Sequence, residues 1–389
     1  MKISVLGTTH PGYTATKEEF ENYSGHAAGV CYMPGTFEEL MNEPAEKTQR
    51  RIAMTKDNMH HSVFGHDQIN LELEDIPKAL AMVINNEHEY TTSEKSARYT
   101  KMVLTEDEQK LYDKWCENFK DLITAKYKTD YPDWFTDSRI KKLAQENARY
   151  LISVFTPTTM LYTTSYRQLN VLYGLMQKEI NNTNSNRFYE MLKPAMKDFC
   201  AAIENLPYFD ETLSKVGRGR RLSLVAPNRA FIEHFGSVYA VRYKASFAEL
   251  AQAQRHRTLD YEFTLLDNNE FYVPPILNQS DALKKEWAED CNKVAKNFPQ
   301  GMLLDVHEMG KLDDFILKMY ERRCTAAQLE IADQTKITFT RYYNSLKWQG
   351  SDLANELEPF RNGARCTFPE FKCTQPCGFK DGVKEEREI

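Results

Sequence analysis

The chain lacks both a long apolar run and an excess of basic residues. None of its 389 residues belongs to a stretch of eighteen apolar residues, so no segment is expected to cross a membrane. Lysine and arginine total 50 against 56 aspartate and glutamate, a formal net charge of -6. Because general nucleic-acid binders carry a basic surface, nucleic acid is not expected as a partner. Residues 1–6 contain no long apolar segment, so we expect no signal peptide and a cytoplasmic protein.

Cysteine is also sparse, with eight residues in the whole chain. Scattered thiols in a long chain are typical of reduced cytoplasmic proteins rather than of disulfide-linked domains. Three of them, Cys366, Cys373 and Cys377, lie close together near the C-terminus. A tetrahedral zinc site needs a fourth ligand, and no histidine is near them in the sequence. We therefore expect no metal, with zinc at these thiols as the less favoured alternative.

The residues that are present describe an ordinary globular protein of two domains. Hydrophobic residues make up 41% and charged residues 27% of the chain, as in typical globular proteins. A length of 389 residues exceeds what one hydrophobic core usually supports. An asparagine-rich break at 181–186 is the best candidate boundary. We expect domains over residues 1–182 and 187–345 and an irregular, cysteine-containing tail over 346–389.

One order of motifs occurs twice. In each half a histidine precedes an alternating strand and a short helix: His66, 68–74 and 76–84, then His234, 238–243 and 246–253. From His66 to Asn86 is 20 residues, and from His234 to Arg255 is 21. Such self-similarity indicates a gene duplication.

The remaining segments are expected to be mainly helical. Residues 1–35 predict a short strand followed by a loop rich in glycine and tyrosine. Helical patterns predict five further helices, at 36–59, 105–127, 137–154, 164–180 and 313–334. The second of these begins with a capping-box pattern, Thr105 to Glu108.

A polar stretch follows each of the two short helices. The second helix is followed by Gln252 and the basic run Arg255-His256-Arg257. The first is followed by a stretch that contains Glu94, Ser96, Arg98 and Tyr99. Taken singly, such charges are more often a solvated helix end or a weak surface ion pair.

Taken together, the two stretches resemble the flavin-dependent thymidylate synthases. In that family Arg-His-Arg follows a strand and a helix, and Ser-x-Arg-Tyr comes a few residues later. The resemblance covers about residues 25–180 and 228–334. It implies an α/β (α+β) fold in two tandem copies, each with a mixed or antiparallel sheet flanked by helices.

The first copy resembles the back part of the family motif. It has Asn86-Glu87-His88 where Arg-His-Arg is expected, and Met176 where the last nucleotide-binding arginine is expected. The family residues that it retains are Glu94, Ser96, Arg98, His60, Arg149 and Arg167.

The second copy resembles the front part of the motif. Where Ser-x-Arg-Tyr is expected it has Leu265-Leu-Asp267-Asn268, and Asn228 replaces the flavin histidine. The family residues that it retains are Gln252, Arg255, His256, Arg257 and Arg322. Random decay would not sort the losses into complementary sets, so we expect one composite site between the two domains.

The resemblance implies an enzyme that transfers a one-carbon unit to C5 of dUMP or a related deoxypyrimidine monophosphate. It implies FAD as cofactor, with methylenetetrahydrofolate and NADPH as co-substrates. In the family, active sites lie between the subunits of a homotetramer. A homodimer of this chain would accordingly rebuild a pseudo-tetramer.

The resemblance also implies roles for the retained residues. Arginine forks bind phosphate oxygens in pairs, and a cation near the pyrimidine stabilises negative charge as it develops. The residues implied to bind substrate are Glu94, Ser96, Arg98, Arg149, Gln252, Arg255 and Arg322, of which Gln252, Arg255 and Arg322 are implied to be catalytic. The residues implied to hold the flavin are His60, Glu94, Arg167, Arg255, His256 and Arg257.

Some positions depart from the family pattern. The serine after Arg-His-Arg is Asp260 in the second copy and Thr91 in the first, and Cys31 stands for a flavin-contacting serine. Two alternatives therefore stay open. One is C5 hydroxymethylation of a deoxypyrimidine monophosphate, and the other is a nucleotide-binding pseudoenzyme.

Overall fold

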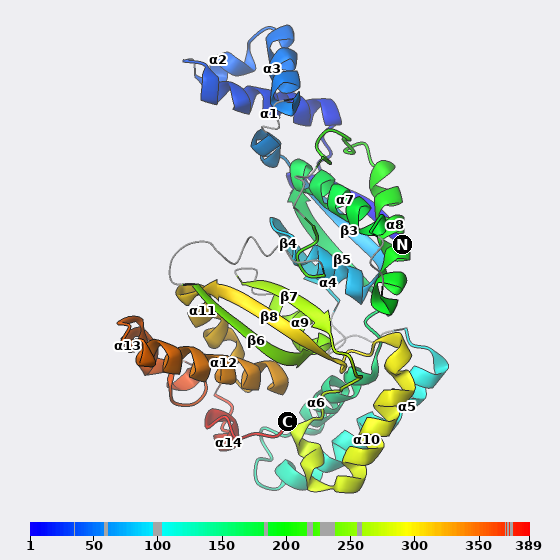
Figure 1. The fold of residues 1–389 in the computed structure, drawn as a ribbon, viewed down its shortest axis with the longest axis vertical. Helices are drawn as coiled ribbons and strands as arrows, with labels where there is room; N and C mark the ends of the chain where they lie inside the picture. The colour runs from blue at the N-terminus through cyan, green and yellow to red at the C-terminus, as the bar shows by residue number, and fades with distance from the viewer. Residues whose placement is uncertain are drawn as a thin grey trace. The chain divides into compact units, whose positions relative to one another are not determined.

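The computed structural model divides into two compact units, each formed by two separate segments of chain (Figure 1). The first unit comprises Met1–Lys95 and Pro157–Ala230, and the second comprises Ser96–Thr156 and Phe231–Ile389. The described residues are 1–34, 36–57, 61–95, 103–182, 186–215, 221–225, 238–254, 259–369, 371, 373 and 376–389. Within these ranges no helix is both long and apolar enough to cross a membrane.

The first unit is organised around an antiparallel sheet with the strand order β2-β1-β3-β5-β4. Alternate residues of β3 are buried, as expected for a strand with one face covered by helices. The strands are β1 (Lys2–Thr8), β2 (His10–Pro11), β3 (Gln68–Pro77), β4 (Tyr90–Glu94) and β5 (Pro157–Ser165).

The helices of the first unit differ from the expectation near the N-terminus. The loop expected within residues 1–35 is wrong, because α1 (Lys17–Tyr32) begins there with a capping box between Thr16 and Glu19. The single helix expected over 36–59 is also wrong, because Pro44 disfavours a helical residue before it. The helices after α1 are α2 (Phe37–Met41), α3 (Ala45–Asp57), α4 (Lys78–Ile84), α7 (Tyr166–Ile180) and α8 (Arg187–Glu204).

The second unit has a three-stranded antiparallel sheet with the order β6-β8-β7. The helix expected over 313–334 is wrong, because α11 ends at Arg322 and α12 begins at Leu329. The strands are β6 (Val238–Ser246), β7 (Asp260–Leu265) and β8 (Leu303–Lys311), and the helices next to them are α9 (Phe247–Ala253), α11 (Leu312–Arg322) and α12 (Leu329–Trp348).

A second layer of this unit combines helices from both halves of the chain. It contains α5 (Glu106–Ile123), α6 (Asp137–Ala148) and α10 (Asp281–Val294). The Trp115 ring of α5 meets the Trp287 ring of α10 edge to face, with 4.7 Å between centroids, and both are fully buried. The C-terminal segment adds α13 (Leu353–Leu357) and α14 (Lys380–Val383), so the tail is not wholly irregular.

The two sheets contain the same three-stranded arrangement. From β3 to α7 and from β6 to α11 the chain runs strand, short helix, strand, a helical region (α5 and α6 in the first segment, α10 in the second), strand and helix, and the third strand pairs with both of the others. We call these segments the first and second repeats.

Positions in the two repeats correspond residue by residue. Lys78 and Phe247, which begin α4 and α9, are 169 positions apart, whereas Pro157 and Leu303, which begin β5 and β8, are 146 apart. The difference reflects α5, for which the second repeat has only the short 3-10 turn Pro275–Gln279 between β7 and α10. The origin of the repeats by duplication stays a prediction.

Candidate functional site

Gln252 lies on α9, which begins directly after β6. Ser246 caps this helix, because its Oγ accepts a hydrogen bond from the Glu249 backbone N at 3.1 Å. The cap sets the start of the helix and thereby the direction of the residues that follow. The Gln252 side chain donates through Nε2 to Oε1 of Gln328, just before α12.

Arg149 reaches the same oxygen from the first repeat. It opens the 3-10 turn Arg149–Leu151 after α6, and its Nη2 donates to Gln328 Oε1 at 2.6 Å. The residue is only 5% exposed. Because a buried cation is costly unless its donors are bonded, this contact holds the guanidinium in a defined place.

Arg322 joins these residues from the last turn of α11. Its Nη2 donates to the main-chain O of Gln252 at 3.2 Å and lies 3.6 Å from Glu321 Oε2. Its side chain is 16% exposed, and a partly shielded charge attracts an anion more strongly than one in bulk water. We call Arg149, Gln252, Arg322 and Gln328 the arginine cluster.

The arginine cluster is supported by residues that sequence reasoning did not single out. Gln328 Nε2 donates to the Tyr150 hydroxyl, which donates to Glu330 Oε2 at 2.9 Å. Ser246 donates to Glu330 through Oγ at 2.6 Å and through N at 2.8 Å. Burial raises the pKa of Glu330, while the hydrogen bonds from Ser246 and Tyr150 act in the opposite direction. Gln328 and Glu330 stand in the same sequence stretch as Arg322, but no pattern connects that stretch to Tyr150.

Glu94 lies in the first unit, at the end of β4. Its carboxylate is 1% exposed and accepts hydrogen bonds from Lys78 Nζ at 2.6 and 2.7 Å. Lys78 is the first residue of α4, so the ion pair ties the start of this helix to the neighbouring strand.

Arg167 also lies in the first unit, in the first turn of α7. The helix is capped by Ser165, whose Oγ accepts from Gln168 N at 3.0 Å. The Arg167 Nε is buried and has no hydrogen-bond partner within the described ranges. A buried donor of this kind favours an acceptor that a bound molecule supplies.

Six other residues with implied roles fall outside the described residues. They are His60, Ser96, Arg98, Arg255, His256 and Arg257. Their roles remain predictions. From the resemblance, Asn86, Glu87 and His88 stand in the first copy where Arg255, His256 and Arg257 stand in the second.

The equivalent positions of the first repeat carry no such cluster. Val83 and Met176 stand where the second repeat has Gln252 and Arg322, and both are buried. Glu87 accepts hydrogen bonds from Ser223 N at 2.6 Å and Oγ at 2.7 Å. In the first repeat, the loop after α4 therefore makes hydrogen bonds within its own compact unit.

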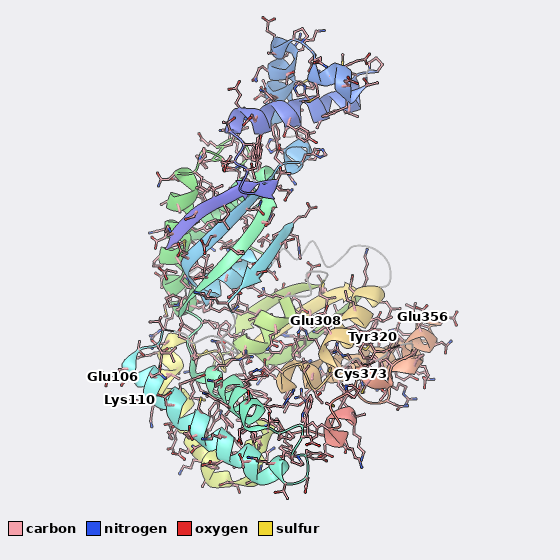
Figure 2. The ribbon with its side chains drawn as sticks, turned by 180° about the vertical axis from the view of Figure 1, so that it is seen from behind. Glu106, Lys110, Glu308, Tyr320, Glu356 and Cys373 are labelled. Atoms are coloured by element: carbon pink, nitrogen blue, oxygen red, sulfur yellow. The ribbon has the colours of Figure 1, made fainter. Side chains whose placement is uncertain are left out.

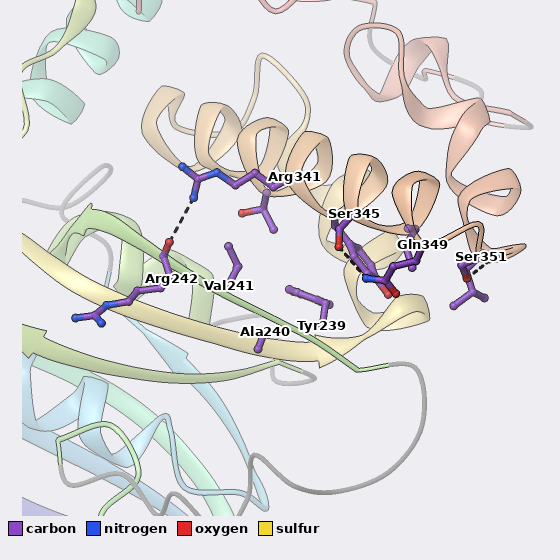
Figure 3. Close-up of a pocket in the computed structure, with 12 residues that line it drawn as sticks. Tyr239, Ala240, Val241, Arg242, Arg341, Ser345, Gln349 and Ser351 are labelled. Carbon is purple, nitrogen blue, oxygen red and sulfur yellow. Dashed lines mark hydrogen bonds between the residues drawn. The ribbon is translucent and has the colours of Figure 1, made fainter.

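A groove of about 640 Å³ lies elsewhere in the second unit, between β6 and α12 (Figure 3). Arg341 Nη1 donates across it to the main-chain O of Arg242 at 3.3 Å. The Arg242 side chain is itself paired with Asp305. None of the residues with implied roles that the structure describes lines this groove.

The cysteines of the tail were the less favoured candidates for a metal site. Cys366, Cys373 and Cys377 are free thiols. Among the described residues, no group of three or more histidine, cysteine or acidic side chains is arranged to hold a metal ion.

Residues 14–196 match the family model described as thymidylate synthase complementing protein, Thy1. This segment contains Glu94, Arg149 and Arg167, and it contributes to both compact units. No match was found among curated proteins.

Solved structures with some likeness to this chain include two kinds of enzyme. One is the flavin-dependent thymidylate synthase ThyX from Helicobacter pylori complexed with FAD and dUMP, at 16% identity and a TM-score of 0.35, covering 55% of this chain and 100% of that one. The other is the UMP/dUMP methylase PolB from Streptomyces cacaoi bound with 5-Br dUMP, at 17% identity and a TM-score of 0.33, covering 55% and 94%. Likeness at this level carries no argument about activity. The family match stands by itself: residues 14–196 of this chain match the model of the thymidylate synthase complementing protein family.

Proposed function

We propose that the protein is a flavin-dependent enzyme that transfers a one-carbon unit to C5 of dUMP at a site built from both repeats. The observation that carries this proposal is the meeting of Arg149 with Gln252 on Gln328 Oε1. Arg149 comes from the family-matched segment, and Gln252 comes from the second repeat beyond it. The site thus draws on both repeats even within one compact unit.

The arginine cluster suits an anionic nucleotide. The phosphate of dUMP is a dianion, and Arg149 supplies a planar fork of charge-assisted donors for it. C5 of neutral uracil is a poor nucleophile, so a cation near the ring stabilises the negative charge that develops during the reaction. Arg322 takes this role, and Gln252 orients the ring. From the resemblance, Ser96, Arg98, Glu94 and Arg255 complete the substrate-binding set.

Arg167 of the first unit fits FAD. Its buried Nε, which has no hydrogen-bond partner among the described residues, is a donor suited to an anionic or carbonyl oxygen of the cofactor. From the resemblance, His60, Glu94, Arg255, His256 and Arg257 join Arg167 in holding it. When bound and reduced, FAD supplies the electrons of the reaction. Methylenetetrahydrofolate supplies the carbon, and NADPH supplies the reducing equivalents.

Because each repeat lacks family residues that the other retains, we expect fewer nucleotide sites than repeats. Met176 and Val83 remove the arginine and the glutamine from the first repeat, so each chain retains one type of nucleotide site. We propose that two chains assemble as a homodimer, equivalent to a tetramer of single repeats.

The proposal is tested with the purified full-length protein. Its visible absorption is recorded as isolated and after incubation with FAD. It is then incubated with dUMP, methylenetetrahydrofolate and NADPH, and the nucleotide product is identified by mass spectrometry. We expect flavin absorbance and a methylated product.

Other results of this experiment would lead to different conclusions about the reaction or the site. A hydroxymethylated product would keep the site but change the reaction. Protein that binds dUMP but stays colourless after FAD treatment and forms no product would support a nucleotide-binding pseudoenzyme. Protein that binds neither FAD nor dUMP would overturn the proposal.

A further inference from the structure

A second group of polar residues is buried in the same unit as the arginine cluster. The Lys318 Nζ lies 2.6 Å from Glu308 Oε2, and both side chains are wholly buried. Tyr239 and Tyr243 donate through their hydroxyls to the two oxygens of Glu308, at 2.6 and 2.7 Å. Glu308, labelled in Figure 2, lies on β8. Its charge is therefore balanced by Lys318 and stabilised by hydrogen bonds.

Glu249 lies among these groups but lacks such partners. It is wholly buried, and both carboxyl oxygens are without a hydrogen-bond partner within the described residues. It stands one helical turn before Gln252 on α9, and Lys318 stands one turn before Arg322 on α11. Each helix thus contributes one residue to the arginine cluster and one residue to the group behind it.

Charged and titratable groups face Glu249 from every element around it. They are Lys318 and Arg322 on α11, Glu308 on β8, Glu330 on α12, Tyr243 on β6 and Tyr261 on β7. Burial raises the pKa of Glu249 to about 8, the carboxylates act in the same direction, and Lys318 and Arg322 oppose them. At neutral pH the side chain is mostly an uncharged acid.

The first repeat shows that the fold itself does not need these polar residues. Its residues at the positions of Glu249, Glu308 and Lys318 are Leu80, Tyr162 and Leu172, all buried. Leu73, which pairs with Met160 as Tyr243 pairs with the equivalent Val306, is buried too. The same strands and helices therefore form around a largely apolar core. Polar residues are concentrated in the repeat that carries Gln252 and Arg322, which indicates that they serve those two residues.

We propose that Glu249 is a positioning residue of the arginine cluster. As an uncharged acid, Glu249 leaves the positive charge of Arg322 available to an anionic nucleotide, and on ionisation it offsets that charge. The inference rests on the proposed function. Losing its proton would add a negative charge that acts on both Lys318 and Arg322 in a medium of low dielectric constant. This charge would offset part of the positive charge of the Arg322 guanidinium, and the attraction of Arg322 for the nucleotide would fall.

The first test needs no ligand. Urea unfolding of the full chain is measured from pH 5 to pH 9 for the wild type, Glu249→Gln and Glu249→Leu, the latter carrying the residue found in the first repeat. The folded wild type keeps a proton that the unfolded chain releases, so its stability relative to either variant should fall between about pH 4.5 and about pH 8 and then level off. The slope corresponds to about one proton per molecule.

The second test measures dUMP binding by calorimetry over the same pH range. We expect wild-type affinity to fall between pH 7 and pH 9 by on the order of tenfold more than that of Glu249→Gln. Asp67→Asn is the matched control, because Asp67 is a buried carboxyl in the first unit whose pKa burial raises to about 6. This control should retain the wild-type profile.

The outcomes separate the two proposals. The positioning role would be overturned if the unfolding free energies of wild type and Glu249→Gln changed in parallel with pH, or if their pH profiles of dUMP binding were identical. Either result would leave the proposed function standing. Absence of dUMP binding at every pH would overturn the proposed function and the positioning role with it. Should both variants fail to fold, the wild-type unfolding curve still decides whether the proton is held.

Discussion

Ser153 forms an antiparallel bridge with Pro299, and the two residues occupy the same position in the two repeats. The hydrogen bonds around the bridge are reciprocal: Val154 N donates to Phe298 O at 2.9 Å, and Gln300 N donates to Ile152 O at 2.6 Å. Val154 and Gln300 are 146 positions apart, as are Ile152 and Phe298, and the first residues of β5 and β8 have the same separation. Equivalent segments of the two repeats are thus paired with each other inside the second unit, as the subunits of a symmetric dimer would be.

This pairing also brings Arg149 to the second repeat. Gly301 N donates to Tyr150 O at 2.6 Å, directly beside the bridge. The turn that carries Arg149 and Tyr150 is therefore anchored to the segment that leads into β8. The position of Arg149 beside Gln328 depends on this anchor.

The first prediction concerns Gly301→Ala. A Cβ at this position would lie 2.8 Å from the Tyr150 Cβ and 2.9 Å from its main-chain O, so the backbone must move apart. We expect a loss of roughly 1–3 kcal/mol in the free energy of unfolding, together with weaker dUMP binding. Urea unfolding and calorimetry measure the two effects. Gly65→Ala is the control, because nothing lies within 4 Å of its added Cβ; equal effects of the two changes would contradict the anchor.

The second prediction concerns the arginines themselves. Arg149→Ala and Arg322→Ala should each weaken dUMP binding by on the order of 100-fold, because each removes charge-assisted hydrogen bonds to an anion. Calorimetry at fixed ionic strength gives the dissociation constants. Arg341→Ala removes an exposed arginine of the same unit and should leave binding unchanged. If only one of the two cluster arginines mattered, the two repeats would not share a nucleotide site.

The third prediction concerns the buried ion pair of Lys318 and Glu308. Lys318→Met leaves Glu308 charged, buried and without its counter-ion, so we expect a loss of about 3–5 kcal/mol in the free energy of unfolding. Adding Glu308→Gln removes the uncompensated charge and should recover part of that loss. Urea unfolding of the single and double variants measures both steps, and a double variant less stable than Lys318→Met would contradict the pairing.

The fourth prediction concerns the acid sensitivity of the first unit. Arg51 donates to both oxygens of Glu43, at 2.7 and 2.9 Å, and these hydrogen bonds lower the pKa of Glu43 to about 2. The ion pair therefore stabilises the folded protein at pH values above 4.5, the ordinary pKa of the carboxyl, and this stabilisation is lost as the pH falls towards 2. At neutral pH, Glu43→Gln should cost roughly 3 kcal/mol.

Thermal unfolding of wild type and Glu43→Gln between pH 7 and pH 3 checks this sign. The difference in unfolding free energy should shrink as the solution becomes more acidic. A difference that grew on acidification would show that Glu43 is not held as a carboxylate by Arg51.

Local patterns in the sequence predicted the short helices and the first strand of each repeat well, but missed the last strand of each repeat. The strands 68–74 and 238–243 and the helices behind them were confirmed as β3, β6, α4 and α9. The helix expected over 164–180 began inside β5, because the change from strand to helix occurs at the capping residue Ser165. Neither β5 nor β8 was predicted, although each lies between two other strands of its sheet. A central strand is stabilised by its neighbours, which lie far away in sequence.

The sequence by itself determined which repeat retains which family residues, since the order of strand, helix and loop is encoded in short local patterns. It paired Asn86 with Arg255, which lies outside the described residues, and Met176 with Arg322, for which the backbone correspondence of the repeats gives the same pair. Only the tertiary structure decided that Arg149 and Gln252 meet on Gln328 and that Glu249 is buried beneath them. Arg149 and Gln328 are 179 residues apart, and contacts at such separation arise from sheet pairing and helix packing, which no local pattern records.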